Sequence, residues 1–269
     1  MANTKSLFHF DNNYTDATGN LSMTVNGTAS FSSGKIGSHC VSFGWGTSYI
    51  SSQNSAIFNI GTGDYTLDGW ASCGYSPNGE WIEIFSIGSM LESSDCLAGC
   101  MMRDTYLYVR HTDRWINTNF NLKTQIDSKW AHIAAVRTNG QVVWYVNGVS
   151  IYTLTDTYSY TVNQPLRVGR RFAGGVDELR FSTISRWQSD FTPLLYAYDN
   201  PAIHGYINDS AKIYVIKEST NTIETTYINT PGNYIIVVDD LSARALIAET
   251  TEGQIVGYGQ VMPVSGTID

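Results

Sequence analysis

Two Asn-Gly dipeptides constrain the fold of this chain more than any other feature. Asn139-Gly140 lies between two runs of alternating apolar and polar residues, and Asn147-Gly148 separates the second run from a third. Both residues of such a pair tolerate positive φ, so the dipeptide favours a two-residue turn between antiparallel strands. The stretch from Trp130 to Leu154 is therefore predicted to form three consecutive strands joined by two tight hairpins.

Similar short runs recur along the whole chain, separated by clusters of Gly, Asn, Asp and Ser, and no amphipathic helical period stands out. The chain has 269 residues, of which 13% are aromatic and only 15% charged, a composition typical of strands and loops. The pattern predicts an all-β protein with an antiparallel two-sheet sandwich or jelly roll.

A change in composition follows Phe191-Thr192-Pro193. Turn-prone residues at Asp199-Asn200-Pro201 precede a new alternating series that begins at His204. We expect a domain boundary near Asn200, with one large β domain over residues 1–199 and a small one over residues 200–269.

The charge balance and the cysteines limit the possible partners and the compartment. With a net charge of −8 and scattered Lys and Arg, nucleic acid is not an expected partner. No apolar run approaches the roughly 20 residues that span a bilayer, so membrane insertion is not expected. The polar amino terminus lacks a secretory pattern, which predicts synthesis in the cytosol and mostly buried thiols. A disulfide between Cys96 and Cys100 is the alternative to watch.

Four phrases recur in an order and at separations that resemble a known family. They are Asp64–Trp70, Trp130–Arg137, Trp144–Gly148 and Gly175–Phe181. Together they resemble the laminin-G-like domains of the concanavalin A-like lectin/glucanase superfamily, over residues 6–193. The resemblance implies an antiparallel two-sheet jelly roll that chiefly binds ligands. Residues 201–269 resemble transthyretin-like and carboxypeptidase-regulatory-like domains, which implies a small β-sandwich.

A structural cation is the first candidate site. In the implied jelly roll the first and last strands are antiparallel neighbours, which brings Asp11 towards Asp177. Asn13 and Asp16 add oxygen ligands of the kind that calcium prefers. The resemblance thus implies a possible Ca²⁺ site at one edge of the sandwich. The alternative is that Asp11, Asn13 and Asp16 form Asx turns and Asp177 pairs with an arginine.

Carbohydrate binding is the second candidate. Sugar sites combine flat aromatic rings with carboxylates, amides or arginines that bind hydroxyl groups. Strand alternation places Tyr106, Tyr108 and Arg110 on one face, beside a hairpin that carries Trp115. The candidate glycan-binding residues are Tyr106, Tyr108, Arg110, Asp113, Arg114, Trp115, Tyr75 and Trp81. The alternative is that these aromatic residues only stabilise the sheet.

The remaining tryptophans are assigned to the core. Trp70, Trp130 and Trp144 lie within the strands of the family resemblance. Leu67 and Trp70 are three residues apart, so burial of both in one core predicts a bulge at Gly69.

Hydrolysis is the third candidate, and we expect a protein that is not an enzyme. Retaining glycosidases need two carboxyl groups about 5–5.5 Å apart. Hydrolases that share the implied fold carry them in a Glu-x-Asp-x-Glu phrase on one strand, which this sequence lacks. Glu80 and Glu83 are three residues apart and should point to opposite faces of a strand.

The sequence therefore predicts a non-catalytic binding and structural module. An opening Leu-x-His-Phe-Asp without a leader resembles the laminin-G-like domains of bacteriophage virion proteins. This implies a tail or capsid-surface protein, made in the host cytoplasm, that contacts cell-surface glycans or other virion proteins. A homo-oligomer is compatible with such a role. The alternatives are a bacterial extracellular adhesin or carbohydrate-binding module and, after it, a glycoside hydrolase of the same fold.

Overall fold

The computed structural model divides the chain into two compact units, Ala2–Leu195 and Tyr196–Ile268. It describes residues 3–75, 78–88, 96–112, 114–161, 163–195 and 197–198, and in the second unit the strand residues 201–207, 211–217, 222–228, 232–237, 244–250, 255–261 and 264–265. In these residues no helix is long and apolar enough to cross a membrane.

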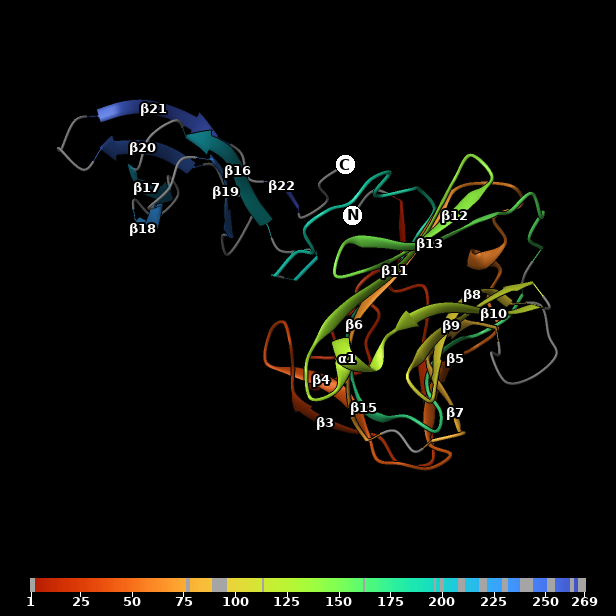
Figure 1. Ribbon diagram of the computed structural model, residues 1–269. Helices are drawn as coiled ribbons and strands as arrows, with labels where there is room; N and C mark the ends of the chain where they lie inside the picture. Colours follow the sequence, from red (N-terminus) through yellow and green to blue (C-terminus); the bar gives the residue numbers. More distant parts are fainter. Residues whose placement is uncertain are drawn as a thin grey trace. The chain divides into compact units, whose positions relative to one another are not determined.

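The first unit consists of two antiparallel sheets packed face to face, as predicted (Figure 1). The eight-stranded sheet has the order β13-β12-β11-β6-β15-β4-β3, with β1 also paired to β15, and the seven-stranded sheet has the order β10-β9-β8-β7-β14-β5-β2. The strands are β1 (Thr4–Phe8), β2 (Met23–Asn26), β3 (Ser30–Ser33), β4 (His39–Phe43), β5 (Tyr49–Ser52), β6 (Tyr65–Tyr75), β7 (Trp81–Ile87), β8 (Cys96–Arg103), β9 (Tyr106–Thr112), β10 (Arg114–Asn121), β11 (Ala131–Thr138), β12 (Gln141–Val146), β13 (Val149–Thr155), β14 (Leu166–Gly169) and β15 (Ala173–Ser182). Two short helical turns, η1 (Ala56–Phe58) and α1 (Lys123–Ile126), complete the described elements.

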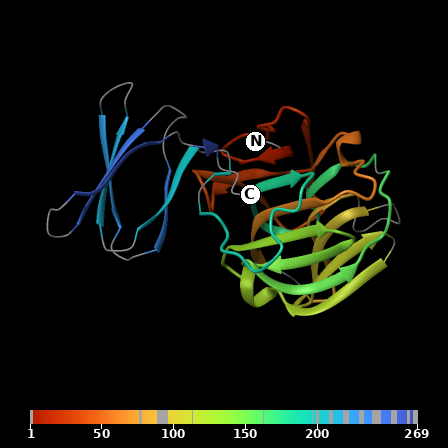
Figure 2. The ribbon, with the colours of Figure 1, turned by 90° about the horizontal axis from the view of Figure 1, so that it is seen from above.

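The second unit is also built from antiparallel strands, drawn in blue colours in Figure 2. One sheet has the order β19-β16-β22 and the other β18-β17-β20-β21. The strands are β16 (Pro201–Ile207), β17 (Ala211–Lys217), β18 (Thr222–Ile228), β19 (Gly232–Val237), β20 (Arg244–Thr250), β21 (Ile255–Val261) and β22 (Val264–Ser265).

The predicted meander is confirmed. β11 pairs with β12 and β12 with β13, and the two Asn-Gly turns connect them. All four turn residues have positive φ, from 48° at Asn139 to 78° at Gly148. This is the geometry that matches the twist of a tight hairpin. Gly148 is also required by packing, because a Cβ there would lie 1.8 Å from the carbonyl oxygen of Phe191.

The core lies between the sheets and is almost entirely apolar. Trp144 is 1% exposed and lies in this core among Phe, Leu, Ile and Val side chains of both sheets, whereas Trp130 is only half-buried. All four cysteines are buried, and in the described part of the chain none of them forms a disulfide.

The bulge predicted at Gly69 occurs on the neighbouring strand instead. β6 pairs with β11 in unbroken register from Tyr65 to Ala71, whereas β15 shifts register between Asp177 and Arg180. Trp70 is buried on the face of the sheet opposite to Leu67, against His132. A bulge in β6 is unnecessary because both faces of this sheet are covered.

The cover on that outer face comes from the segment after β15. Trp187 and Phe191 stack with ring centroids 3.8 Å apart, and both rings contact His132 edge-on at 5.7 Å. Phe191 also packs on Tyr145 of β12. The closing segment of the first unit therefore covers the outer face of the eight-stranded sheet around His132 and Tyr145.

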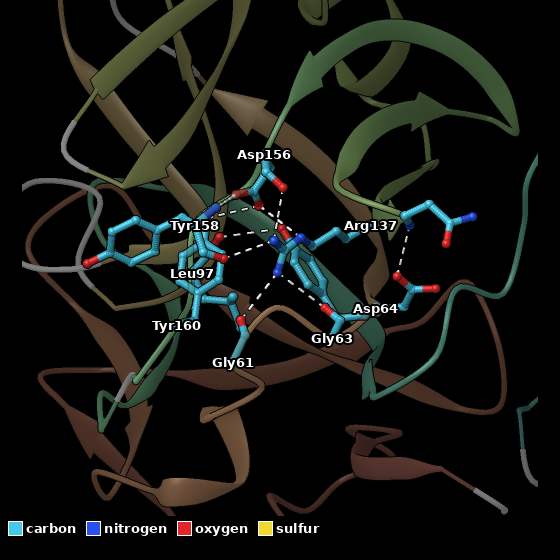
Figure 3. Close-up of polar contacts among 10 residues, drawn as sticks. Gly61, Gly63, Asp64, Leu97, Arg137, Asp156, Tyr158 and Tyr160 are labelled. Carbon is cyan, nitrogen blue, oxygen red and sulfur yellow. Dashed lines mark hydrogen bonds and ion pairs between the residues drawn. The ribbon is translucent and has the colours of Figure 1, made fainter.

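One end of the sandwich is held by a buried arginine. Arg137 is 1% exposed, and Figure 3 shows its guanidinium between the loops at 61–63 and 156–160. Its Nη atoms donate to the carbonyl oxygens of Gly61, Gly63, Asp156 and Tyr158 at 2.9–3.3 Å. Its Nε lies 3.3 Å from the Asp156 carboxylate. A single side chain thus neutralises a buried acid and satisfies four loop carbonyls.

Replacement of this arginine tests its structural role. Arg137→Ala leaves the buried Asp156 carboxylate without its cation and several loop carbonyls without this donor, so we expect a loss of about 3–5 kcal/mol in the free energy of unfolding. The matched control is Lys123→Ala, which removes a partly exposed ion pair with Asp127 at 2.9 Å. That change should cost less than about 0.5 kcal/mol. Urea unfolding of both variants checks this, and similar midpoints would contradict it.

Candidate functional site

Four adjacent strands, β7 to β10, bring the predicted aromatic residues onto the outer face of the seven-stranded sheet. Trp81 lies opposite Arg103 of β8, and Arg103 lies opposite Tyr106 of β9. Met101 lies opposite Tyr108. Side chains of paired residues point to the same face, so Trp81 shares a surface with residues more than 20 positions away in the sequence.

Three rings form a contiguous cluster, which we call the strand-face shelf: Trp81, Tyr108 and Trp115. The ring centroid of Trp81 lies 4.8 Å from that of Tyr108 and 5.1 Å from that of Trp115. Trp115 is 38% exposed, while Trp81 and Tyr108 are half-buried against Cys96 and Met101. The shelf is therefore packed from below and open at Trp115.

Two arginines and an amide fix the rings of the shelf. The guanidinium of Arg103 lies 4.7 Å from the ring centroid of Trp81, and that of Arg110 lies 4.8 Å from that of Trp115. A cation over an indole is attracted to the negative ring face. Asn117 Nδ2 donates to the hydroxyl oxygen of Tyr108 at 3.1 Å. The rings are thus preorganised before any ligand arrives.

Other predicted glycan-binding residues lie around or away from this cluster. Tyr106, the first residue of β9, is 42% exposed, and Arg114, the first residue of β10, is exposed as well. Tyr75 does not join the shelf but forms an edge contact with Trp45, with centroids 5.9 Å apart. Asp113 and the acidic part of the loop at 89–95 lie outside the described residues.

A buried polar group lies on the same sheet face. Ser86 Oγ donates to Glu83 Oε1 at 2.5 Å, and both residues are fully buried. Burial raises the pKa of the nearby Cys96 thiol. The charge of Arg110 opposes this rise, and the charge of Glu83 adds to it. Glu80, by contrast, is 44% exposed and lies 3.0 Å from Arg171. The two glutamates thus occupy different environments, one buried and one at the surface.

The predicted metal ligands Asp11 and Asp177 bind the same turn, between β3 and β4. Asp11 Oδ1 accepts hydrogen bonds from the amides of Ser38 and His39 at 2.6 and 2.8 Å. Asp177 Oδ2 accepts from the amides of Lys35 and Ile36 at 2.7 and 2.9 Å. Each acid holds one side of the turn through backbone donors.

The other two predicted ligands form Asx turns. Asn13 Oδ1 accepts from the Thr15 amide at 2.8 Å, and Asp16 Oδ1 accepts from the amides of Leu7 and Thr18, both at 2.9 Å. Asp16 Oδ2 accepts from Leu21 as well. In the described part of the chain no three His, Cys, Asp or Glu side chains cluster in a way that could hold a metal ion. Calcium binding at these residues stays a prediction.

Asp177 combines full burial with an incomplete set of partners. Its Oδ1 is buried and accepts no hydrogen bond from the described residues. Burial raises the pKa of Asp177 to about 7, the amides of Ile36 and Lys35 oppose the rise, and the charge of Glu178 adds to it. For Asp11 burial also raises the pKa, but hydrogen bonds from His39 and Ser38 lower it overall.

Sequence reasoning missed Trp45. It lies in a Gly-Trp-Gly stretch between β4 and β5 that reads only as a turn. In the structure it is 43% exposed and contacts Tyr75. The one available signal was an indole flanked by glycines, which has no evident place in a strand.

Comparison with known proteins finds similarity only among solved structures. No protein-family model matches the chain, and no curated protein matches it. Domain 4 of the extracellular arabinanase AbnA from Geobacillus stearothermophilus, solved with arabinotriose, is 21% identical over 68% of this chain and 93% of that one, with a TM-score of 0.54. The receptor-binding domain of botulinum neurotoxin D is 10% identical over 93% of this chain and 73% of that one, with a TM-score of 0.58.

A third structure, of botulinum neurotoxin type C, is described as depending on two ganglioside molecules for cell entry. It is 12% identical over 91% of this chain and 70% of that one, with a TM-score of 0.54. At such identities the likeness shows a shared fold. The chain is therefore an all-β protein with an antiparallel two-sheet sandwich, a class that includes carbohydrate-binding domains.

Titration of Asp177 gives a testable pH dependence. Because its folded pKa of about 7 exceeds the ordinary value of 3.8, the folded state binds more protons between these values. Stability should therefore fall as pH rises through this window. Asp177→Asn keeps an acceptor for Lys35 and Ile36 but cannot ionise. We expect its melting temperature to gain several degrees relative to the wild type between about pH 5 and about pH 8, measured in EDTA.

The same pair of proteins tests the calcium prediction. A cation bound by Asp177 would raise the melting temperature of the wild type and leave that of Asp177→Asn unchanged.

For the pH dependence, a difference between the two melting temperatures in EDTA that is constant with pH would show that the raised pKa of Asp177 is wrong.

Proposed function

We propose that the first unit is a non-catalytic carbohydrate-binding module whose ligand lies on the strand-face shelf. The observation that carries this proposal is the exposed indole of Trp115 beside Trp81 and Tyr108, with the ring centroids of Tyr108 and Trp115 at 4.8 and 5.1 Å from that of Trp81. Flat rings offer an apolar surface to the C–H face of a sugar, and nearby amide and guanidinium groups serve its hydroxyls. The exposed indole of Trp115 should therefore contribute more to ligand binding than to the stability of the fold.

The solved structures that share the fold support this proposal. The arabinanase domain was solved with arabinotriose, and the neurotoxin type C structure is described through its interaction with gangliosides. These are properties of those proteins. They support the proposal because proteins with a sandwich of this kind bind sugars.

We further propose that the protein is a bacteriophage virion component, on a tail or capsid surface, made in the host cytoplasm and attached to host glycans or neighbouring virion proteins. The resemblance of the opening strand to laminin-G-like virion domains supports this setting. The runner-up is a bacterial extracellular adhesin or carbohydrate-binding module. The genes that flank the coding sequence separate the two, since structural phage genes are expected for the first and cell-wall or export genes for the second.

An enzymatic role would require two carboxyl groups that face one substrate. Glu83 is fully buried and accepts a hydrogen bond from Ser86, whereas Glu80 is at the surface with Arg171. A glycan panel incubated with the protein should therefore yield no hydrolysis products. Release of reducing ends from any glycan would overturn the non-catalytic proposal.

The shelf is tested by replacement of its exposed ring. Trp115→Ala should weaken binding to glycans that the wild type retains on an array by about tenfold or more, because an indole stacked on a ligand typically contributes over 1 kcal/mol. Its free energy of unfolding should change by less than about 1 kcal/mol.

The control is Trp144→Ala, which opens a cavity in the core. It should cost about 3–5 kcal/mol and lower all binding through unfolding. If Trp115→Ala unfolds early like this control, or binds glycans as tightly as the wild type, the shelf is not the ligand site.

A further inference from the structure

A second aromatic pair lies apart from the strand-face shelf, where the β4–β5 loop meets the end of β6. Trp45 and Tyr75 are 43% and 56% exposed, and their ring planes meet at 84° with centroids 5.9 Å apart. About half of each of these side chains is left in water, which is unfavourable for apolar area. The two rings form an open corner that folding alone does not bury.

Glycines flank this corner without a packing reason. Gly44 and Gly46 stand on either side of Trp45, and a Cβ on either would meet nothing within 4 Å. Gly46 needs its glycine because its φ is +147°, but Gly44 has no positive φ. Neither crowding nor backbone conformation explains glycine at position 44. What it provides is bare, accessible backbone beside an exposed indole.

A strained loop places charged groups at the same corner. Arg170 and Arg171 are consecutive non-glycine residues with φ of +88° and +53°. Their amides donate to the carbonyl oxygens of Ser48 and Gly46 at 3.1 and 2.8 Å, which ties this loop to the Trp45 loop. Left-handed backbone at such residues is unfavourable and persists where the surroundings enforce it, often at ligand sites.

Arg171, at the end of the strained loop, contributes little to the stability of the fold through its ion pair. Arg171 Nη1 lies 3.0 Å from Glu80 Oε2, and the two side chains are 45% and 44% exposed. Ion pairs this exposed contribute little to folding, because water screens the charges. The strain is therefore better explained by the position it gives to Arg171 and Glu80 than by the energy of their ion pair.

We propose that Trp45, Tyr75, Arg171 and Glu80 form a second carbohydrate-binding site. The rings take the apolar face of one sugar residue, and the guanidinium and carboxylate bind its hydroxyl groups. Two rings with a charged rim suit a small polar ligand, since a protein partner would need a far larger apolar patch. The site uses other rings than the shelf, so it can be present even if the shelf binds nothing.

The test follows the indole N–H resonances of the tryptophans in a ¹⁵N-labelled full-length protein, with Trp45 and Trp115 assigned by Trp→Phe variants. The probes are lactose, maltose, cellobiose, xylobiose and chitobiose, each added to millimolar concentration. At least one should shift the Trp45 resonance along a saturable curve, in the wild type and in Trp115→Ala alike. Shifts at Trp115 alone would support the shelf and overturn the second site.

Two further variants test the roles of the rings and the charges. Tyr75→Ala and Glu80→Gln should each raise the dissociation constant read at Trp45 by about tenfold, with melting temperatures close to that of the wild type. The matched control is Tyr158→Ala, because Tyr158 is 45% exposed and also makes an edge contact with a tyrosine, at 4.9 Å, in another loop. Saturable shifts that are unchanged in Tyr75→Ala and Glu80→Gln would overturn the proposed site, as would the absence of any Trp45 shift.

Discussion

The buried ion pair between Asp68 and Arg180 is the interaction on which the first unit depends. Both guanidinium contacts to the carboxylate measure 3.0 Å, and His132 Nε2 lies 3.2 Å from the same acid. Burial raises the pKa of Asp68, but the charge of Arg180 opposes this rise and the pKa is lowered overall. The acid is therefore ionised. The pair joins β6 to β15, and His132 adds β11, on the outer face of the eight-stranded sheet. Loss of one partner would leave a charge in an apolar layer, which is strongly unfavourable.

That constraint decides which surfaces remain for ligands. A charged group on a sheet face is stable out of water only if something covers it, and the segment with Trp187 and Phe191 does so. The part of the outer face around His132, Tyr145 and Arg180 is thereby covered. The exposed indole of Trp115 instead lies on the seven-stranded sheet, while Trp45 lies in the β4–β5 loop and Tyr75 at the end of β6. The strand-face shelf thus lies on the sheet whose outer face this segment does not cover.

Local patterns in the sequence predict local structure here, and they stop where contacts become long-range. Asn-Gly turns predict the meander because both residues tolerate positive φ, and alternation in β9 places Tyr106 and Tyr108 on one face. Trp81 joins Tyr108 only through the pairing of three strands, which no local pattern contains. The bulge expected at Gly69 assumed a single buried face. Trp45 was missed because a glycine-flanked indole carries no strand or helix signal.

The two proposed sites make different demands on the fold, and this difference bears on how the module would bind. The shelf is preorganised by Arg103 and Arg110, which hold its indoles at 4.7 and 4.8 Å, so little conformational entropy is lost on binding. The corner at Trp45 depends on a loop held in left-handed backbone by two hydrogen bonds. Two sites on one sandwich gain affinity when a glycan-rich surface engages both at once. A surface that displays many sugars would therefore be favoured over a free oligosaccharide.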